Sequence, residues 1–167
     1  LMSMHQFSAY FLDGLAISCE TLVGEAVGQK NYSKLIQAIK ACTLFSIGVG
    51  CGLSLILWIL GRYIIDLMSS LPEVTLIAKA NLVWVALLPA LSVASFLLDG
   101  IFIGATWSKP MRNTMIISTF GVFFPMCLLL EKYDNKGLWI AFLSFIIARG
   151  IFLGNALSKE LKHNQWR

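Results

Sequence analysis

Long, nearly uninterrupted apolar segments dominate this sequence, and short polar segments separate them. A helix needs roughly 20 mostly apolar residues to cross the hydrocarbon core of a bilayer. We therefore predict five membrane-spanning helices, at residues 6–28, 41–65, 74–104, 111–130 and 137–157. The segments between them read QKNYSK, SSLPE, TWSKP and EKYDNK. A transmembrane β-barrel is excluded, because its strands alternate apolar and polar residues in runs of about ten.

The composition agrees with a membrane protein. Charged residues make up 13% of the chain and apolar residues 57%, and the mean hydropathy is +0.76. A soluble domain typically has about 25% charged and 45–50% apolar residues. We predict an all-α, polytopic membrane bundle that forms one domain over residues 1–167.

Basic residues in the short loops predict the orientation, because lysine and arginine accumulate on the cytoplasmic side. Three basic residues fall on one side, namely Arg62, Lys132 and Lys136. Eight fall on the other side, namely Lys30, Lys34, Lys40, Lys109, Arg112, Lys159, Lys162 and Arg167. We expect the larger group, and with it the C-terminus, to be cytoplasmic.

The start of the chain does not have the form of a complete membrane protein. It opens on Leu1, it has an odd number of predicted spans, and it lacks the pattern of a signal peptide. We expect a C-terminal part of a longer protein, with further helices upstream.

Two acids lie within the first predicted span. A carboxylate at mid-helix costs about 2.5–3.5 kcal/mol of insertion free energy, so Asp13 and Glu20 make this helix marginal on its own. With Ile17 and Gly24 they follow a 4-3-4 spacing, which places them on one helix face. We expect this face to line the bundle interior or a water-filled path, and Asp13 and Glu20 are candidates for a substrate or ion pathway. The alternative is that they only stabilise helix packing.

A third acid, Asp99, lies in the third predicted span together with Pro89. The proline is expected to break the helix and free a carbonyl group. Asp99 lies near the cytoplasmic end, so we favour a structural role over a functional one. Arg149 in the fifth span is expected to extend toward the cytoplasm, and the alternative is that it pairs with a buried carboxylate.

Glycines recur four residues apart, at Gly24 and Gly28, at Gly48 and Gly52, and at Gly100 and Gly104. This spacing is typical of helices that approach closely. The run GVGCG lies inside an apolar span, so it is not a dinucleotide-binding loop.

The sequence indicates no catalytic or metal centre. The cysteines Cys19, Cys42, Cys51 and Cys127 form no CxxC pair, and His5 and His163 lie at opposite ends of the chain. No nucleophile motif occurs. We expect no enzyme activity and no cofactor. The net charge of +4 is accounted for by the loops and predicts no nucleic-acid partner.

Two segments resemble a transporter family. LDGLAISCETLVGEAVGQKNYSKL (12–35) looks like the C-terminal lobe of the multidrug and toxic compound extrusion (MATE) family. LLDGIFIGATWSKPMRNTM (97–115) resembles the corresponding turn of its bacterial DNA-damage-inducible protein F subgroup and is the more specific match. The similarity runs in order over nearly the whole chain. It implies a protein of twelve helices in two lobes, in which this chain would match helices eight to twelve.

The resemblance also implies a function. Family members are secondary antiporters of the cell membrane, here the bacterial inner membrane, in which protons or sodium ions move in while organic cations or other toxic compounds move out. The substrate cavity would form between this lobe and the N-terminal lobe, whose first helix carries the acid usually tied to coupling. Asp13, Glu20 and Asp99 would all lie in the C-terminal lobe. The expected partners are the bilayer, the N-terminal lobe and a small organic substrate.

Two other functions remain open from the sequence. One is a flippase for lipid-linked compounds or polysaccharides with a similar architecture, which export of a cationic dye would argue against. The other is a membrane remnant that does not transport.

Overall fold

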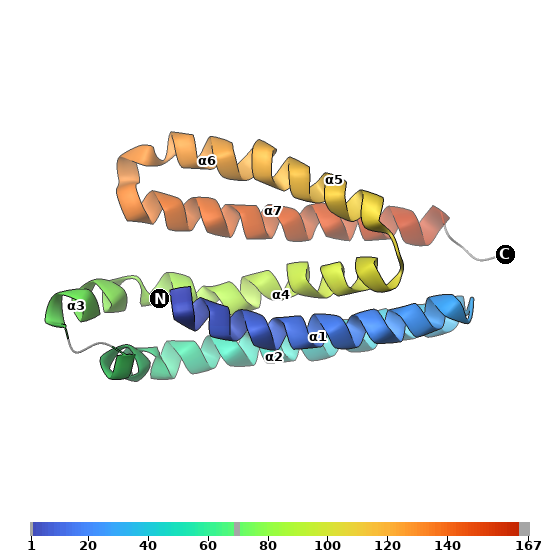
Figure 1. Cartoon of the computed structure of the whole chain (residues 1–167), viewed down its shortest axis with the longest axis horizontal. Coiled ribbons are helices and arrows are strands. Elements are labelled where there is room, and N and C mark those ends of the chain that lie inside the picture. Colours follow the sequence, from blue (N-terminus) through green and yellow to red (C-terminus); the bar gives the residue numbers. More distant parts are fainter. Residues whose placement is uncertain (1, 69–70, 164–167) are drawn as a thin grey trace.

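The computed structural model describes residues 2–68 and 71–163, and these are helical almost throughout (Figure 1). No strand occurs in the described ranges, so the predicted all-α class is confirmed. A π-helical turn, Thr119–Phe123, joins α5 to α6, and a 3-10 turn, Glu131–Tyr133, precedes α7. The α-helices are α1 (Met2–Gly28), α2 (Tyr32–Met68), α3 (Pro72–Ala80), α4 (Leu82–Gly104), α5 (Ser108–Ser118), α6 (Phe124–Leu129) and α7 (Asp134–His163).

Four helical segments within the described residues are long and apolar enough to cross a membrane, and the chain is a multi-pass membrane protein. They are residues Tyr32–Met68, Leu82–Gly104, Ser108–Leu129 and Asn135–Lys162. Helix α1 has the length of a span, 27 residues, but it is not among the four. Its acids Asp13, Glu20 and Glu25 lower its hydropathy. The fifth span therefore stays a prediction.

The observed helices differ from the predicted spans mainly at their ends. Helix α2 begins nine residues before the predicted residue 41, because the helix continues into the polar interface where hydropathy gives no signal. The predicted span 74–104 is divided between α3 and α4. At this division the side-chain amide of Asn81 donates to the Ile77 carbonyl, 2.9 Å away, and so ends α3.

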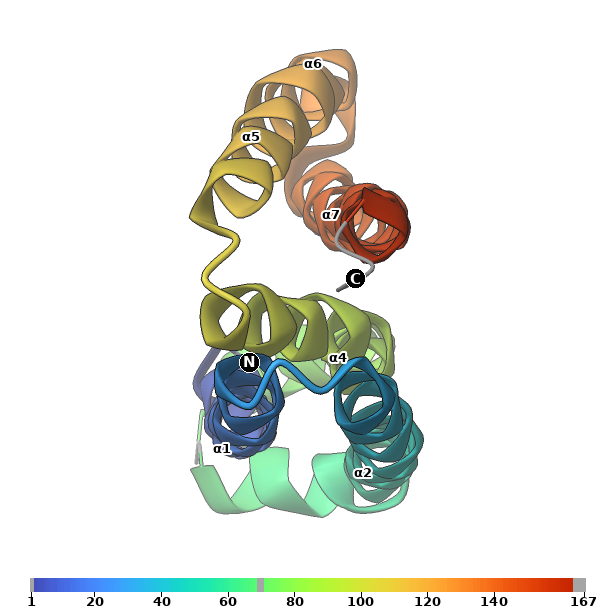
Figure 2. The same ribbon diagram turned by 90° about the vertical axis from the view of Figure 1, so that its right-hand side faces the viewer.

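Helix α4 is the centre of the molecule. It packs against α1 and α2 on one side and against α7 on the other, while α5 and α6 run antiparallel to α7 (Figures 1 and 2). One apolar cluster joins α1, α2, α4 and α7 through the core residues Met4, Leu57, Ile65, Leu82, Val85, Ala86, Leu88, Trp139, Leu143 and Ile146. A second cluster joins α1, α2 and α4 through Cys19, Val23, Ala26, Leu35, Leu97, Ile101 and Ala105. The interior is therefore filled on both sides of α4.

The predicted break at Pro89 is wrong, because α4 continues through this residue. A proline disturbs the hydrogen bonds of the preceding turn. Here the main-chain N–H of Ala90 donates to the Ser54 hydroxyl of α2, 2.9 Å away. This bond ties α4 to α2 next to the proline, and α4 continues there as one helix.

Close helix contacts form at some of the predicted glycines and not at others. Gly100 and Gly104 lie directly on the α1 backbone, and a Cβ at Gly24 would be 3.5 Å from the Gly104 carbonyl oxygen. Within the described residues no close contact forms at Gly28, Gly48 and Gly52, where a Cβ would meet nothing within 4 Å. Gly28 is the last residue of α1 and is exposed, and no described helix lies opposite it.

The predicted grouping of basic residues matches the arrangement of the helices. The α1–α2 turn, the α4–α5 turn and the end of α7 lie together at one end of the bundle, the right in Figure 1, which we call the basic end. Arg167 lies outside the described residues. Lys79 was placed inside a predicted span, but it lies in α3 at the opposite end, with Nζ 2.6 Å from Asp66 Oδ1. The opposite end thus gains a fourth basic residue. Which side of the membrane each end faces stays a prediction.

Candidate functional site

Three charged side chains from three helices form a polar cluster beside α4. They are Asp13 of α1, Asp99 of α4 and Arg149 of α7, and we call them the three-helix cluster. Arg149 Nη2 donates to Asp99 Oδ2 at 2.6 Å. The side chains of Arg149 and Asp99 are only 20% and 19% exposed. This ion pair joins α4 to α7 within the apolar part of the bundle.

The expectation that Arg149 extends toward the cytoplasm is wrong, and the alternative of a buried pair is what forms. Asp99 lies opposite Arg149 on the adjoining helix face. An unpaired guanidinium would bear the full cost of leaving water, and a carboxylate within hydrogen-bonding distance offsets it. The pair also agrees with the structural role expected for Asp99, because it ties two helices together.

Asp99 has unused hydrogen-bonding capacity. Its Oδ2 accepts from Arg149, but its Oδ1 is buried without a partner among the described residues. Most buried polar atoms in proteins have a partner, so an exception requires an explanation. Oδ1 can accept one further hydrogen bond or take a proton.

Asp13 adds a second negative charge. It is exposed on α1, one turn before Ala16, whose main-chain carbonyl lies against Gly100, the residue after Asp99. Two carboxylates and one guanidinium give the cluster a net charge of −1 when all are ionised. A net negative charge in apolar surroundings favours the entry of a cation or a proton.

The approach of α1 to α4 positions these acids. Each helix carries an Asp-Gly pair, Asp13-Gly14 and Asp99-Gly100. Gly100 lies on the main-chain carbonyl of Ala16, one turn after Asp13. The glycine beside one acid thus brings the other acid near.

Glu20, the second predicted pathway residue, lies two turns closer to the basic end. It is half-buried, and its backbone carbonyl lies on Gly104. Its carboxylate has no hydrogen bond or ion pair to the described residues. The structure therefore brings Asp13, but not Glu20, into the three-helix cluster.

The exposed face of α1 is more polar than a lipid-facing helix would be, and the sequence analysis missed this. Gln6, Tyr10, Asp13 and Thr21 are exposed and share a face with Ile17, at spacings of 4, 3, 4 and 4 residues. Gln6 Nε2 lies 3.4 Å from the Tyr10 hydroxyl. The spacing of hydroxyl and amide side chains at helical intervals along α1 was the signal in the sequence that indicated this polar face. We expect this face to line water or protein rather than lipid chains.

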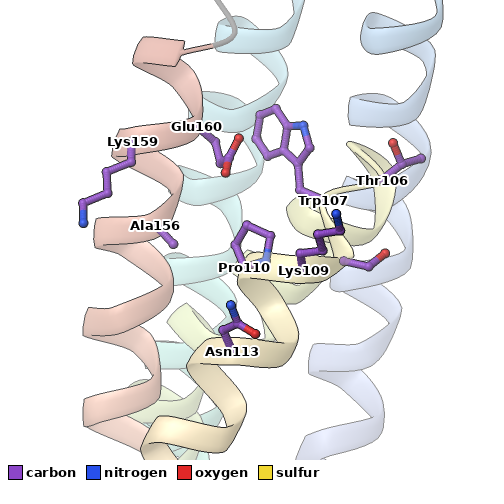
Figure 3. A pocket seen from close by; sticks show the side chains of 9 residues that line it. Thr106, Trp107, Lys109, Pro110, Asn113, Ala156, Lys159 and Glu160 are labelled. Atoms are coloured by element: carbon purple, nitrogen blue, oxygen red, sulfur yellow. The ribbon is translucent and has the colours of Figure 1, made fainter.

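A cavity of about 660 Å³ lies at the basic end, between the start of α5 and the end of α7. The side chains of Trp107, Pro110, Asn113 and Glu160 surround it, while Lys159 points away (Figure 3). None of the three-helix cluster lines it, so this cavity is separate from the cluster. No group of metal-ligating side chains occurs within the described residues.

Comparisons with known proteins cover almost the whole chain. A family model described as MatE matches residues 1–129. The chain is 35% identical over 167 residues to DNA damage-inducible protein F of Escherichia coli (strain K12). This match covers 99% of this chain and 36% of that protein. It is 23% identical over 137 residues to Protein DETOXIFICATION 44, chloroplastic, of Arabidopsis thaliana. This second match covers 82% of this chain and 26% of that protein. No solved structure matches. The matched part of the chain thus spans about a third of the length of the first relative and about a quarter of the second.

Proposed function

Because this chain belongs to the MATE family of membrane transporters, we propose that it is part of a secondary active antiporter that exports organic compounds in exchange for protons or sodium ions. The observation that carries this proposal is the three-helix cluster, whose Asp99–Arg149 ion pair joins two helices long and apolar enough to cross a membrane and whose net charge is −1 when all three groups are ionised. The printed name of the plant relative refers to detoxification, which agrees with the export of harmful compounds.

The cluster has the properties that cation exchange requires. A charged side chain in a membrane is costly, so such residues usually lie on substrate, ion or proton pathways. Asp13 is open to the polar face of α1, and Asp99 keeps one oxygen without a partner. Entry of a proton or a metal cation would remove the net negative charge and so weaken the binding of an organic cation. Competition of this kind couples the two movements.

The orientation completes the proposal. We place the protein in the bacterial inner membrane with the basic end in the cytoplasm, because seven of the described basic residues belong to that end and four to the other. The polar face of α1 would then line the path shared with the N-terminal lobe. The outward-facing apolar side chains of α2, such as Phe45, Ile56 and Leu67, would contact lipid.

Efflux of a cationic dye from cells that express the full-length gene product tests the proposal. Asp13→Asn and Glu20→Gln should each reduce efflux severalfold while protein abundance stays nearly unchanged. Asp99→Asn should reduce both, because Arg149 then loses its partner. The matched control is Glu25→Gln, since Glu25 is exposed near the end of α1 and bonds only Gln29, at 2.8 Å. Normal efflux from both α1 variants at several pH values would refute a role of these acids in transport.

A further inference from the structure

The ion pair between Asp99 and Arg149 has an unusual form for a purely structural contact. One guanidinium nitrogen bonds one carboxylate oxygen, although arginine and carboxylate groups can form two parallel bonds. The second oxygen, Oδ1, stays buried and without a partner among the described residues. A carboxylate held by only one of its oxygens can exchange its partner more readily than one held by both.

The surroundings of the pair favour such an exchange. Asp13 adds a second, exposed carboxylate on α1, one turn before the contact of Ala16 with Gly100, the residue after Asp99. A positive charge that arrives along the exposed face of α1 would therefore be attracted to both acids, and Arg149 would be its competitor. The Arg149 side chain is 20% exposed, so it is not fully enclosed.

Helix α7 contacts α4 through few polar bonds near this pair. The Ser95 hydroxyl donates to the Ile146 carbonyl at 3.1 Å, and a Cβ at Gly150 would lie 3.7 Å from the Ala94 Cβ. Toward the basic end, Leu157 and Leu161 of α7 pack against the second apolar cluster. Without the ion pair, apolar contacts and the Ser95 bond would hold α7 to α4, so the contact would be looser.

We infer that Arg149 is a built-in counter-ion of the transport site: it neutralises Asp99 in the absence of substrate, and a transported organic cation displaces it and thereby loosens α7 from α4. This inference rests on the proposed antiport function and gives it a substrate class. Because the bond to be replaced is an N–H···O hydrogen bond, the favoured cations carry N–H donors, as ammonium, guanidinium and amidinium ions do. Cations without N–H groups should compete less well. Arg149 is thus a positioning residue that acts through Asp99.

Equilibrium binding to the purified full-length gene product provides the first test, with benzamidinium and tetraphenylphosphonium as probes. The wild type should bind benzamidinium more tightly than tetraphenylphosphonium. Arg149→Gln should raise the affinity for benzamidinium about tenfold, which corresponds to about 1.4 kcal/mol, because the internal competitor is gone. Arg149→Lys keeps the charge but loses the planar fork of the guanidinium, so it should raise the affinity for benzamidinium a few-fold. This variant replaces Arg149→Gln in the test if Arg149→Gln does not fold. Asp99→Asn should abolish the difference between the two probes.

A disulfide between α4 and α7 provides the second test. In a background without Cys19, Cys42, Cys51 and Cys127, the pair Ala94→Cys and Gly150→Cys should cross-link under mild oxidation, since their Cβ separation is close to the disulfide value of about 3.8 Å. Benzamidinium should lower the cross-linking rate. Adding Asp99→Asn or Arg149→Gln should lower it without any cation. Each single cysteine alone is the control.

The outcomes separate this inference from the proposed function. If no variant binds either cation, the transport proposal and this inference fall together. If binding requires Asp99 but Arg149→Gln leaves it unchanged or weakens it, the transport proposal stands and this inference is refuted. A merely structural Arg149 would lower protein abundance in its variants and would not raise the affinity for benzamidinium.

Discussion

Gly100 of α4 lies directly against the main-chain carbonyl of Ala16 of α1, with no space between them for a methyl group. One turn later, Gly104 repeats the contact against the carbonyl of Glu20. The two glycines therefore set the distance between α1 and α4. This distance in turn places Asp13 beside Asp99, so a packing feature of the backbone determines the geometry of the charged cluster.

We expect Gly100→Ala to lower the stability of the protein by about 1–3 kcal/mol, because the new methyl group forces two helix backbones apart. Thermal unfolding of the full-length gene product in detergent measures the change. Gly48→Ala is the matched control, since a Cβ there meets nothing within 4 Å, and alanine should stabilise the helix by up to about 1 kcal/mol. Equal melting temperatures for the two variants would show that α1 does not contact α4 at Gly100.

Thr106 has a strained backbone that a glycine should relieve. It ends α4 at φ 61°, and its N–H donates to the Ile103 carbonyl at 2.9 Å. A left-handed conformation costs a side chain with a Cβ roughly 1–2 kcal/mol, so Thr106→Gly should raise stability by a similar amount. Thr106→Ala is the control, because it removes the hydroxyl bond to the Ala105 carbonyl and keeps the Cβ. If alanine stabilises as much as glycine, backbone strain is not the cause.

We expect Ser54 to stabilise helix α4, which contains a proline. Its hydroxyl accepts the Ala90 N–H, and Ser54→Ala would remove this partly buried bond between α2 and α4. The expected loss of stability is about 1–3 kcal/mol. Ser158→Ala should change stability by less than about 0.5 kcal/mol, since Ser158 is exposed and bonds only its own helix. A similar loss in both variants would contradict a specific role for Ser54.

The sequence predicted the class of fold and the division into apolar helices, because hydropathy and bilayer thickness act on each segment separately. It did not predict contacts between segments. Gly48 and Gly100 have the same kind of spacing, yet among the described residues a helix lies against Gly100 and none lies against Gly48. The partner of Arg149 was also open, because hydropathy cannot tell whether a carboxylate lies across the interface. Asp13 was found as a candidate, whereas its relation to Asp99 depended on the packing of α1 on α4.

The basic end should face the cytoplasm, and cysteine labelling in intact cells tests this. Asn31 is a poor place for the reporter, because its side-chain oxygen accepts the Lys34 N–H at 3.0 Å and so caps α2. Ser33 is exposed two residues later, and Asn135 is exposed at the opposite end. In a background without the native cysteines, an impermeant maleimide should label Asn135→Cys in intact cells. It should label Ser33→Cys only after the membrane is opened, because the excess of basic residues holds that end inside. Labelling of Ser33→Cys in intact cells would reverse the orientation, and with it the direction in which the three-helix cluster receives its cations.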